Sequence, residues 1–375
     1  MDLRDTPAQA NFRARLRSWL EANMPTEPEP ATMPARFHFV VRWQKKLYSG
    51  GWVALSWPRE YGGQGLGPIE ESILNQELGR AGAPPAASFT FLGRALLTHG
   101  TEEQKRRYLP GFLASDEIWC QGFSEPEAGS DLASLRTTAV RNDDGNFVIN
   151  GQKLWTSRGS FADFCLVLAR TGSPESRHRG ISALIVPMTT PGVSRRPLIM
   201  ANGDEEFAEV FFDDVVVPGE NLVGELNGGW KVTQATLAYE RGAADLGYLA
   251  KYERMLADIS GEATRRGLAG DVSTAEAIGR VLMHLEVLRM HSMRRLSDRA
   301  SGRPVGAETS IDKLTMTKTE QLLLHTALDV LGPSAVLGHG GWFKKYLYSR
   351  AASIYGGTSQ IQRNVISGRL LGLED

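Results

Sequence analysis

The spacing of apolar residues divides the chain into three parts. Up to about residue 118 the apolar positions recur at helical spacing, as Phe12, Leu16, Trp19 and Leu20 do within a helix expected over 7–23. Further helices are expected over 37–50, 68–79, 92–99 and 101–113, the last with a helix start at Thr101. These patterns predict an N-terminal α-helical domain over residues 1–118.

From residue 119 the apolar positions alternate, which is typical of half-buried strands. Strands are expected over 136–142, 146–150, 164–170, 181–187 and 209–217, and hairpin turns at Asp143–Asn146 and Asn150–Gly151. Strands and helices do not alternate here, which argues against a dinucleotide-binding Rossmann domain. The pattern predicts a middle antiparallel β domain, forming a small barrel, over residues 119–226.

After Gly228 and Gly229 the helical pattern returns and continues to the end of the chain. Helices are expected over 230–259, 274–300, 308–331, 342–354 and 358–371, and the short breaks between them predict antiparallel neighbours in a bundle. Ser359 and Gln362 have the spacing of a capping box at the start of the last helix. The fold class is therefore α+β, with a C-terminal helical bundle over residues 227–375.

Composition and charge exclude several classes of function. The chain has 375 residues and a formal net charge of −1, so no overall field attracts it to nucleic acid or to an anionic membrane. No apolar run approaches membrane-spanning length, and the seven histidines show no spacing typical of metal ligands. With only Cys120 and Cys165 and no signal-peptide pattern, we expect a cytoplasmic protein without disulfides or a metal site.

Two Gly-, Ser- and Thr-rich stretches carry the candidate chemistry of the middle domain. The first runs from Trp119 to Asp131 and the second from Asn150 to Gly159, each attached to the end of an expected strand. Backbone N–H groups and hydroxyls in such loops suit an anionic or carbonyl-rich ligand. Trp155 offers an aromatic face to a flat ligand.

Three motifs in this order resemble those of the acyl-CoA dehydrogenase family. They are SEPEAGSD at 124–131, NGQKLWTS at 150–157 and YGGTSQIQ at 355–362. The resemblance extends from Trp57 to Arg369 and implies FAD bound between the β domain and the bundle. Its implied FAD-binding residues are Gln121, Phe123, Ser124, Gly129, Ser130, Trp155, Thr156, Ser157, Thr358 and Gln360. The start of a helix after Gly356 and Gly357 independently favours phosphate near Thr358 and Gln360.

The resemblance also implies the reaction and its base. Members of the family remove the α proton of an acyl-CoA thioester with a carboxylate while the β hydrogen leaves as hydride to flavin N5. In many members the base is a Glu before Gly-Thr in the third motif, but Gly356 stands there. In the branch similar to isovaleryl-CoA enzymes, a Glu before an Arg on the first long bundle helix replaces it. Glu240 and Arg241 match that arrangement.

Glu240 is therefore the expected base. The implied substrate-binding residues are Ser130, Arg241, Tyr355 and Gly356. A glycine at 356 frees space beside the reacting carbons, so a branched or bulky acyl group is expected, with trans-2-enoyl-CoA as the product.

The chain departs from the family at three further places. Residues 262–278 lack the Arg-x-x-Phe-Gly stretch of many homotetramers, residues 329–333 replace a Gln-x-x-Gly-Gly stretch, and Gly368 replaces an Arg. The resemblance implies electron-transfer flavoprotein as the acceptor, and either a homo-oligomer or a two-plus-two heterotetramer with a second dehydrogenase-like subunit.

Two alternatives remain beside the dehydrogenase. One is a flavin-dependent monooxygenase on the same fold, which needs no carboxylate base and is therefore disfavoured by Glu240. The other is a non-catalytic partner subunit of a heteromeric acyl-CoA dehydrogenase, which Gly356 favours and Glu240 disfavours.

Overall fold

The computed structural model describes residues 4–87, 90–240, 245–303, 306–337 and 341–373. The chain forms two compact units. The first, called here the helical unit, contains Met1–Thr26, Gly65–Pro84 and Arg241–Asp375. The second, called the sheet unit, contains Glu27–Gln64 and Pro85–Glu240.

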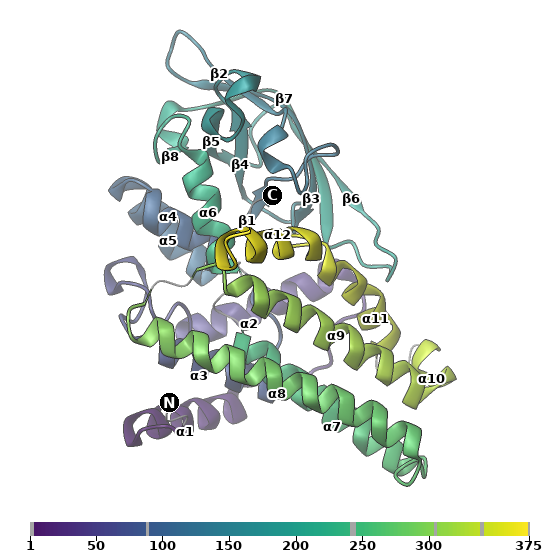
Figure 1. The fold of residues 1–375 in the computed structure, drawn as a ribbon. Coiled ribbons are helices and arrows are strands. Elements are labelled where there is room, and N and C mark those ends of the chain that lie inside the picture. The colour runs from purple at the N-terminus through teal and green to yellow at the C-terminus, as the bar shows by residue number, and fades with distance from the viewer. Residues whose placement is uncertain (1–3, 88–89, 241–244, 304–305, 338–340, 374–375) are drawn as a thin grey trace. The chain divides into compact units, whose positions relative to one another are not determined.

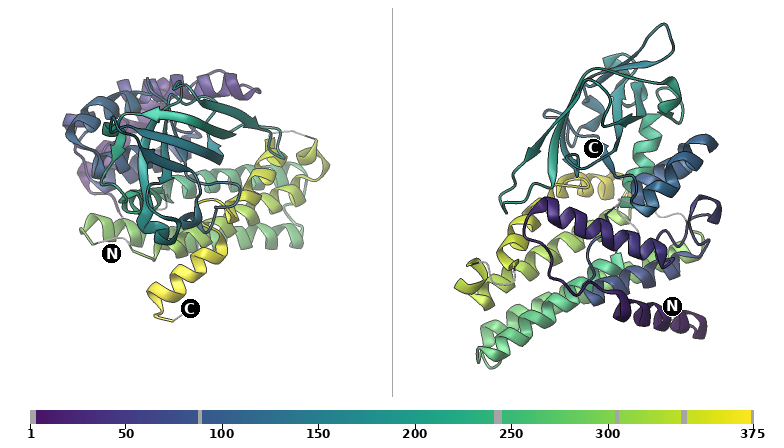
Figure 2. Two further views of the ribbon diagram at one scale, coloured as in Figure 1. Left: turned by 90° about the horizontal axis from the view of Figure 1, so that it is seen from above. Right: turned by 180° about the vertical axis from the view of Figure 1, so that it is seen from behind.

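The helical unit is built mainly from antiparallel helices (Figure 1). Its helices are α1 (Pro7–Asn23), α3 (Pro68–Ala81), α7 (Asp245–Arg265), α8 (Val272–Ala300), α9 (Thr309–Leu331), α10 (Pro333–Val336), α11 (Trp342–Ser349) and α12 (Ser359–Leu370). The long helices α7 and α8 lie side by side, as both views in Figure 2 show. Their shared core contains Leu249, Ile259, Val281 and Leu285, and each such side chain contributes about 1.5–3 kcal/mol when fully buried.

A buried carboxylate joins α1 to α3 within this unit. The Glu77 side chain on α3 is 1% exposed and pairs with Arg13 at 2.8 Å, Arg17 at 2.8 Å and Arg80 at 2.7 Å. Burial by itself raises the pKa of Glu77, but hydrogen bonds from the three guanidinium groups outweigh it and lower this pKa to about 2. The ionised carboxylate is thus the form that the fold stabilises.

Because of Glu77, the free energy of unfolding depends on pH in the acid range. Its folded pKa of about 2 lies below the ordinary value of 4.5, so its contribution is complete above pH 4.5 and is lost as pH falls toward 2. We expect Glu77→Gln to lower the free energy of unfolding by about 3 kcal/mol at pH 7, with the difference from wild type shrinking below pH 4.5. Urea unfolding at several pH values measures this. Glu21→Gln, at an exposed position on α1, is the matched control, and a deficit that does not change with pH would contradict the prediction.

The sheet unit combines one β-sheet with four α-helices among its described residues. The helices are α2 (Met33–Ser49), α4 (Thr90–His99), α5 (Glu102–Ala114) and α6 (Gly229–Glu240). The strands are β1 (Trp119–Gly122), β2 (Thr138–Arg141), β3 (Phe147–Ser157), β4 (Phe164–Arg170), β5 (Ile181–Pro187), β6 (Val193–Leu198), β7 (Phe207–Val217) and β8 (Leu222–Val223). Their order is β6-β7-β3-β2-β4-β5-β8, with β1 paired to β4. Cys120, Ile149, Val167 and Leu184 contribute to the core beneath the sheet.

The sheet differs from the expected antiparallel barrel in two respects. β1 pairs with β4 in parallel, Cys120 opposite Cys165, and β2 meets β4 in parallel at Thr138 and Arg170. Neither pair is joined by a hairpin, so chain direction is not constrained by a short turn. Among the described strands the pairing path runs from β6 to β8 without closing, so the sheet is open and mixed.

The expected turn at Asn150–Gly151 is wrong. These residues lie inside β3, which continues to Ser157 and pairs with β7. The register shifts between Ile149 and Gly151, where Gly151 has a φ of +148°. A Cβ at Gly151 would lie 2.5 Å from Thr137 Oγ1, so the glycine permits a bulge where a turn was expected.

Most expected helices are present with small shifts at their ends, but the last cap differs. Thr101 caps α5 in a capping box with Gln104, as expected. For α12 the cap is Thr358, whose hydroxyl accepts from Ile361 N at 3.2 Å, and not Ser359. The helix expected over 342–354 ends at Ser349 and continues as a 3-10 turn, Arg350–Ser353. The domain boundaries expected at 118 and 226 stay a prediction.

Candidate functional site

A buried ion pair holds the SEPEAGSD loop against β3. Lys153 Nζ lies 2.7 Å from Glu125 Oε1 and also donates to the carbonyl of Phe123 at 3.1 Å. The other contacts of Glu125 are the backbone N–H groups of Arg136 at 2.6 Å and Thr137 at 2.9 Å. The two side chains are 0% and 6% exposed. The pair thereby joins two of the three sequence motifs in one rigid element.

Both members of this pair are charged groups removed from water. Burial lowers the pKa of Lys153, and the nearby Glu125 carboxylate partly offsets that effect. Burial also acts to raise the pKa of Glu125, but the Lys153 charge and the N–H donors outweigh it, so the pKa of Glu125 is lowered. Each charge depends on the other, so neither can be removed alone without leaving an uncompensated buried group. The sequence predictions gave neither residue a role.

The residues expected to surround a flavin lie along β1, the following loop and β3. Leu154 N donates to Ser124 O at 2.9 Å, which brings the two stretches together. Phe123 is 3% exposed, while Gly129 and Ser130 are exposed at the far end of the loop. A Cβ at Gly129 would meet no atom within 4 Å, so the loop surface is open there.

Polar atoms without partners occur among these residues. Gln121 Oε1 and Thr156 Oγ1 are buried and have no hydrogen-bond partner in the described part of the chain. Thr156 is fully buried, and Ser157 is half-buried at the end of β3. Buried polar atoms normally find a partner, so unpaired ones mark a place where water or a ligand completes the structure.

Trp155 is turned outward by a second irregularity in β3. The register between β3 and β7 shifts between Lys153 and Thr156, and Trp155 adopts a φ of +58°. Its side chain is 57% exposed and packs edge-on against Phe207, with ring centroids 5.9 Å apart. Such backbone geometry is unfavourable for a bulky residue and is typical of functional sites. An indole face is thus presented on the surface of the sheet unit.

The third motif forms a tight turn in the helical unit. Gly356 and Gly357 have φ values of +62° and +91°, and Gln362 Nε2 donates to their carbonyls at 2.9 and 3.3 Å. The φ of Gly357 is one that residues with a side chain rarely adopt, so glycine is favoured there, and a Cβ would also displace Gln362 Nε2, which lies 2.4 Å from its position. Thr358 is committed to capping α12, while Gln360 is exposed on its first turn.

Lys313 on α9 contacts the residues just before this turn. The sequence predictions did not identify it. It is 7% exposed, and Nζ donates to Ala352 O at 3.0 Å, as does Thr317 Oγ1 at 3.2 Å. The same Nζ lies 4.2 Å from the centroid of the Tyr355 ring. This contact is a cation–π interaction. Lys313 therefore fixes the residues that directly precede Gly356.

The expected base lies at the end of α6. Glu240 is the last residue of that helix, and its side chain lies outside the described residues. Arg241 also lies outside the described residues. Gly356 carries no side chain, so the turn itself offers no carboxylate at that position.

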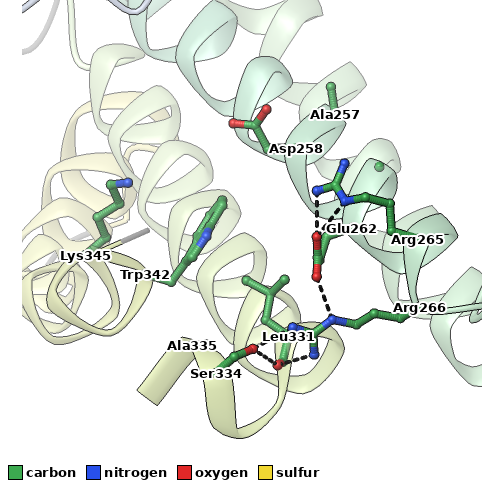
Figure 3. A pocket seen from close by; sticks show the side chains of 11 residues that line it. Ala257, Asp258, Glu262, Arg265, Arg266, Leu331, Ser334, Ala335, Trp342 and Lys345 are labelled. Atoms are coloured by element: carbon green, nitrogen blue, oxygen red, sulfur yellow. Dashed lines mark hydrogen bonds and ion pairs between the residues drawn. The ribbon is translucent and has the colours of Figure 1, made fainter. Parts of the chain in front are cut away.

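The two stretches that depart from the family pattern in the bundle lie next to each other (Figure 3). Arg266 donates to Leu331 O and to Ser334 Oγ and also pairs with Glu262 at 2.7 Å. Glu262, Arg266, Leu331 and Ser334 line a pocket of about 590 Å³. Trp342 and Lys345 line the same pocket. The contacts of Arg266 show that 262–266 and 331–334 adjoin in one surface of the helical unit.

Neither a membrane span nor a metal cluster is found where the chain is described. None of the helices in the described ranges is long and apolar enough to cross a membrane. Over the same ranges, no group of three or more His, Cys, Asp or Glu side chains is arranged to hold a metal ion.

Comparisons with known proteins cover the whole fold. Acyl-CoA dehydrogenase N-terminal, middle and C-terminal domain models match residues 6–116, 120–215 and 227–371. The acyl-CoA dehydrogenase IpdE1 of Mycobacterium tuberculosis is 39% identical over 96% of this chain and 97% of its own length.

Two solved structures share this architecture. The Tcur3481-Tcur3483 steroid ACAD has a TM-score of 0.88 at 32% identity, with full coverage of both chains. The ChsE4-ChsE5 complex of Mycobacterium tuberculosis has a TM-score of 0.87 at 33% identity, also with full coverage of both chains. The expected three-part fold is thereby confirmed, and the chain belongs to the acyl-CoA dehydrogenase family, whose members are flavin-dependent oxidoreductases that act on acyl-CoA thioesters.

Proposed function

We propose that this chain catalyses the FAD-dependent α,β-dehydrogenation of a branched or bulky acyl-CoA to the trans-2-enoyl-CoA. Glu240 acts as the base, and the cofactor supplies the hydride acceptor at flavin N5. The observation that carries the proposal is the pairing of a family match along the whole chain with Gly356 at the usual position of the base.

The residues of the sheet unit fit a flavin. Gln121 Oε1 and Thr156 Oγ1 lack partners in the described ranges, and Trp155 exposes an aromatic face that a flat ring system can contact. Gln121, Phe123, Ser124, Trp155, Thr156 and Ser157 would hold the ring system. Gly129, Ser130, Thr358 and Gln360 would hold phosphate groups of the cofactor, with the N-terminus of α12 favouring negative charge.

The chain's own groups would prepare the substrate for proton loss. Ser130, Arg241, Tyr355 and Gly356 would contact the thioester. The cation–π contact of Lys313 would hold the Tyr355 ring in place. The α proton is only weakly acidic, so Glu240 must act in a dry pocket where desolvation raises the affinity of its carboxylate for a proton. Glu240 then takes the α proton at a carboxylate oxygen.

The left-handed Gly356 supports the preference for bulky acyl groups. Gly356 has a φ of +62° and no Cβ, so at the proposed site it would leave space next to the reacting carbons. One structural neighbour is a steroid ACAD, which is consistent with a large, ring-bearing acyl group here.

Anaerobic titration tests the reaction and the acyl preference together. We expect flavin absorbance of the purified protein to bleach on addition of an α-branched or ring-bearing acyl-CoA. A straight-chain acyl-CoA of equal carbon number should give a kcat/KM about tenfold lower, because a chain that leaves the space unfilled loses apolar contact. A clear preference for the straight chain would overturn the acyl assignment, and bleaching by neither thioester would overturn the reaction.

A heteromeric assembly has its own support. Two of the structural neighbours are complexes of two different chains, Tcur3481-Tcur3483 and ChsE4-ChsE5. We propose that this chain works in an oligomer, as a homo-oligomer or as the base-carrying partner in a two-plus-two heterotetramer, and passes electrons to an electron-transfer flavoprotein. Flavin that appears only after co-expression with a second dehydrogenase-like subunit would identify the heteromer.

A further inference from the structure

A buried arginine lies in the turn that follows β3, and the assignments above give it no role. Arg158 is 7% exposed and comes directly after Ser157, the last residue of β3. Gly159 N donates to Thr156 O at 3.1 Å, which closes the turn. Arg158 N donates to Glu206 O at 2.7 Å, just before β7. The backbone of Arg158 is therefore paired within the sheet unit at the point where the chain leaves β3.

The guanidinium of Arg158 bonds to a distant segment of the same unit. Nη2 donates to Ala86 O at 2.8 Å, and Nη1 donates to Ala87 O. These acceptors lie 72 and 71 residues away along the chain, shortly before α4. Two nitrogens of one planar group reach two consecutive carbonyls, an arrangement that a single ammonium cannot reproduce. The side chain thus ties the end of β3 to the segment that leads into α4.

Two residues in the left-handed region flank the last two residues of β3. Trp155 has a φ of +58° and Arg158 has a φ of +60°. Residues with a side chain rarely adopt this conformation, and it persists where surrounding contacts determine the backbone. For Arg158, these contacts are the two bonds of its guanidinium and the bond of its own N–H. Thr156 and Ser157 are therefore held between two constrained residues.

The turn packs directly against the side chain of Thr156. A Cβ on Gly159 would lie 3.0 Å from Thr156 Cγ2, so a movement of the turn would also move Thr156. The Thr156 side chain is fully buried, and its Oγ1 has no hydrogen-bond partner in the ranges that the structure describes. Buried hydroxyls normally have a partner, and a flavin would provide one under the proposed function.

A second arginine holds the chain on the other side of the turn. Arg195 on β6 donates from Nη1 to the carbonyls of Gly159 at 3.1 Å, Ser160 at 3.4 Å and Ala162 at 2.9 Å. Arg195 thereby fixes the path from the turn toward β4. Arg158 fixes the β3 side of the turn, where Thr156 lies.

We propose that Arg158 is a positioning residue for the flavin edge. By holding the turn against Ala86 and Ala87, its guanidinium fixes the Thr156 hydroxyl, which the family resemblance directs toward the N5 side of the ring system. The inference rests on the proposed function, because it needs a flavin beside Thr156. Arg158 touches neither flavin nor substrate and acts through the hydroxyl of Thr156.

The test compares the affinity of the apoprotein for FAD with that for deaza-FAD, in which a carbon replaces N5. The protein is used as the full chain, together with a second dehydrogenase-like subunit if its flavin requires one. Wild type should bind FAD about tenfold more tightly, which corresponds to one good hydrogen bond at N5. Arg158→Met should lower the affinity for FAD about tenfold and leave the affinity for deaza-FAD within twofold. An equal fall for both cofactors, or an unchanged affinity for FAD, would overturn the inference.

A double-mutant cycle shows whether Arg158 acts through Thr156. Thr156→Val alone should weaken FAD binding about tenfold, because valine has no hydroxyl. In the Arg158→Met background the same change should weaken binding by less than twofold, because the hydroxyl is already displaced. Losses that simply add would show that the two residues act independently and would contradict the proposal.

Arg158→Lys keeps the test decisive if Arg158→Met does not fold. Lysine retains the positive charge and can donate to one of the two carbonyls, so the turn is held less firmly. We expect the affinity for FAD to fall about threefold and the affinity for deaza-FAD to stay unchanged. Arg42→Met removes a guanidinium that is 62% exposed on α2 and should alter neither affinity. A loss for Arg158→Lys no larger than for Arg42→Met would refute the role of Arg158.

The cofactor affinities separate this inference from the proposed function. If wild type binds FAD and no thioester bleaches it, the proposed dehydrogenation fails. A loss of selectivity between FAD and deaza-FAD in Arg158→Met would then still support the role of Arg158. If wild type oxidises an acyl-CoA but binds both cofactors equally, the inference alone is overturned.

Discussion

Glu240→Gln is expected to reduce kcat for the acyl-CoA by roughly 10²–10⁴-fold, which is the usual contribution of a positioned general base. Glutamine keeps the size of the side chain and one acceptor oxygen but cannot accept the α proton. KM should change little, because the same thioester contacts remain. Stopped-flow measurement of anaerobic flavin bleaching isolates this step.

The matched control for the base is Glu225→Gln. Glu225 is an exposed carboxylate shortly before α6, and its weak contact with Lys231 spans 3.9 Å. Its loss should leave kcat within twofold. If Glu240→Gln retains the wild-type bleaching rate, Glu240 is not the base, and another group removes the α proton. Flavin that reacts only with reductant and oxygen would favour the monooxygenase, and flavin that binds only with a second polypeptide would favour the non-catalytic partner subunit.

Lys153→Met is expected to destabilise the sheet unit by about 3–5 kcal/mol, because it leaves the Glu125 carboxylate buried without its cation. The SEPEAGSD loop would also lose the contact from Lys153 Nζ to Phe123 O. We therefore expect a lower midpoint in urea unfolding together with a loss of bound flavin. Both are measured on one preparation by fluorescence and absorbance.

Two further variants show whether the pair or the lysine alone is responsible. The double variant Glu125→Gln, Lys153→Met removes both charges and should recover part of the loss. Lys231→Met removes a lysine that is 74% exposed and should change the free energy of unfolding by less than about 0.5 kcal/mol. A Lys153→Met variant as stable as Lys231→Met would refute the structural role of the pair.

The Lys153–Glu125 pair and Arg170 act on the same loop from its two ends. Arg170, the last residue of β4, is buried and donates to the carbonyls of Ala133 and Leu135. Lys153 secures Glu125 near the start of the SEPEAGSD loop, and Arg170 secures Ala133 just beyond its end. Gly129 and Ser130 stay exposed between these two anchors. The sheet unit thus offers a rigidly supported but open segment, which is the arrangement that a ligand contact needs.

The sequence determined the order of elements because local signals decide them. Helical spacing in 7–23 and the Thr101 cap predicted α1 and α5, and apolar segments typical of strands predicted β4 and β5 at their observed bounds. The three motifs were sufficient to identify the family. The third motif has Gly356, which cannot remove a proton, where many members have the base, and the assignment of Glu240 as its replacement stays a prediction.

Only the tertiary structure decided which strands pair and which side chains contact each other. Asn150–Gly151 has the composition of a turn, yet pairing with β7 keeps it inside β3, because cross-strand hydrogen bonds outweigh local turn preference. Lys153 pairs with Glu125, 28 residues away, and Arg170 donates to Ala133, 37 residues away. Arg170 also donates to Arg177 in the loop that follows β4. No local sequence pattern identifies these partners. A buried charge is stabilised by groups that folding brings together, and that proximity is a property of the packed chain.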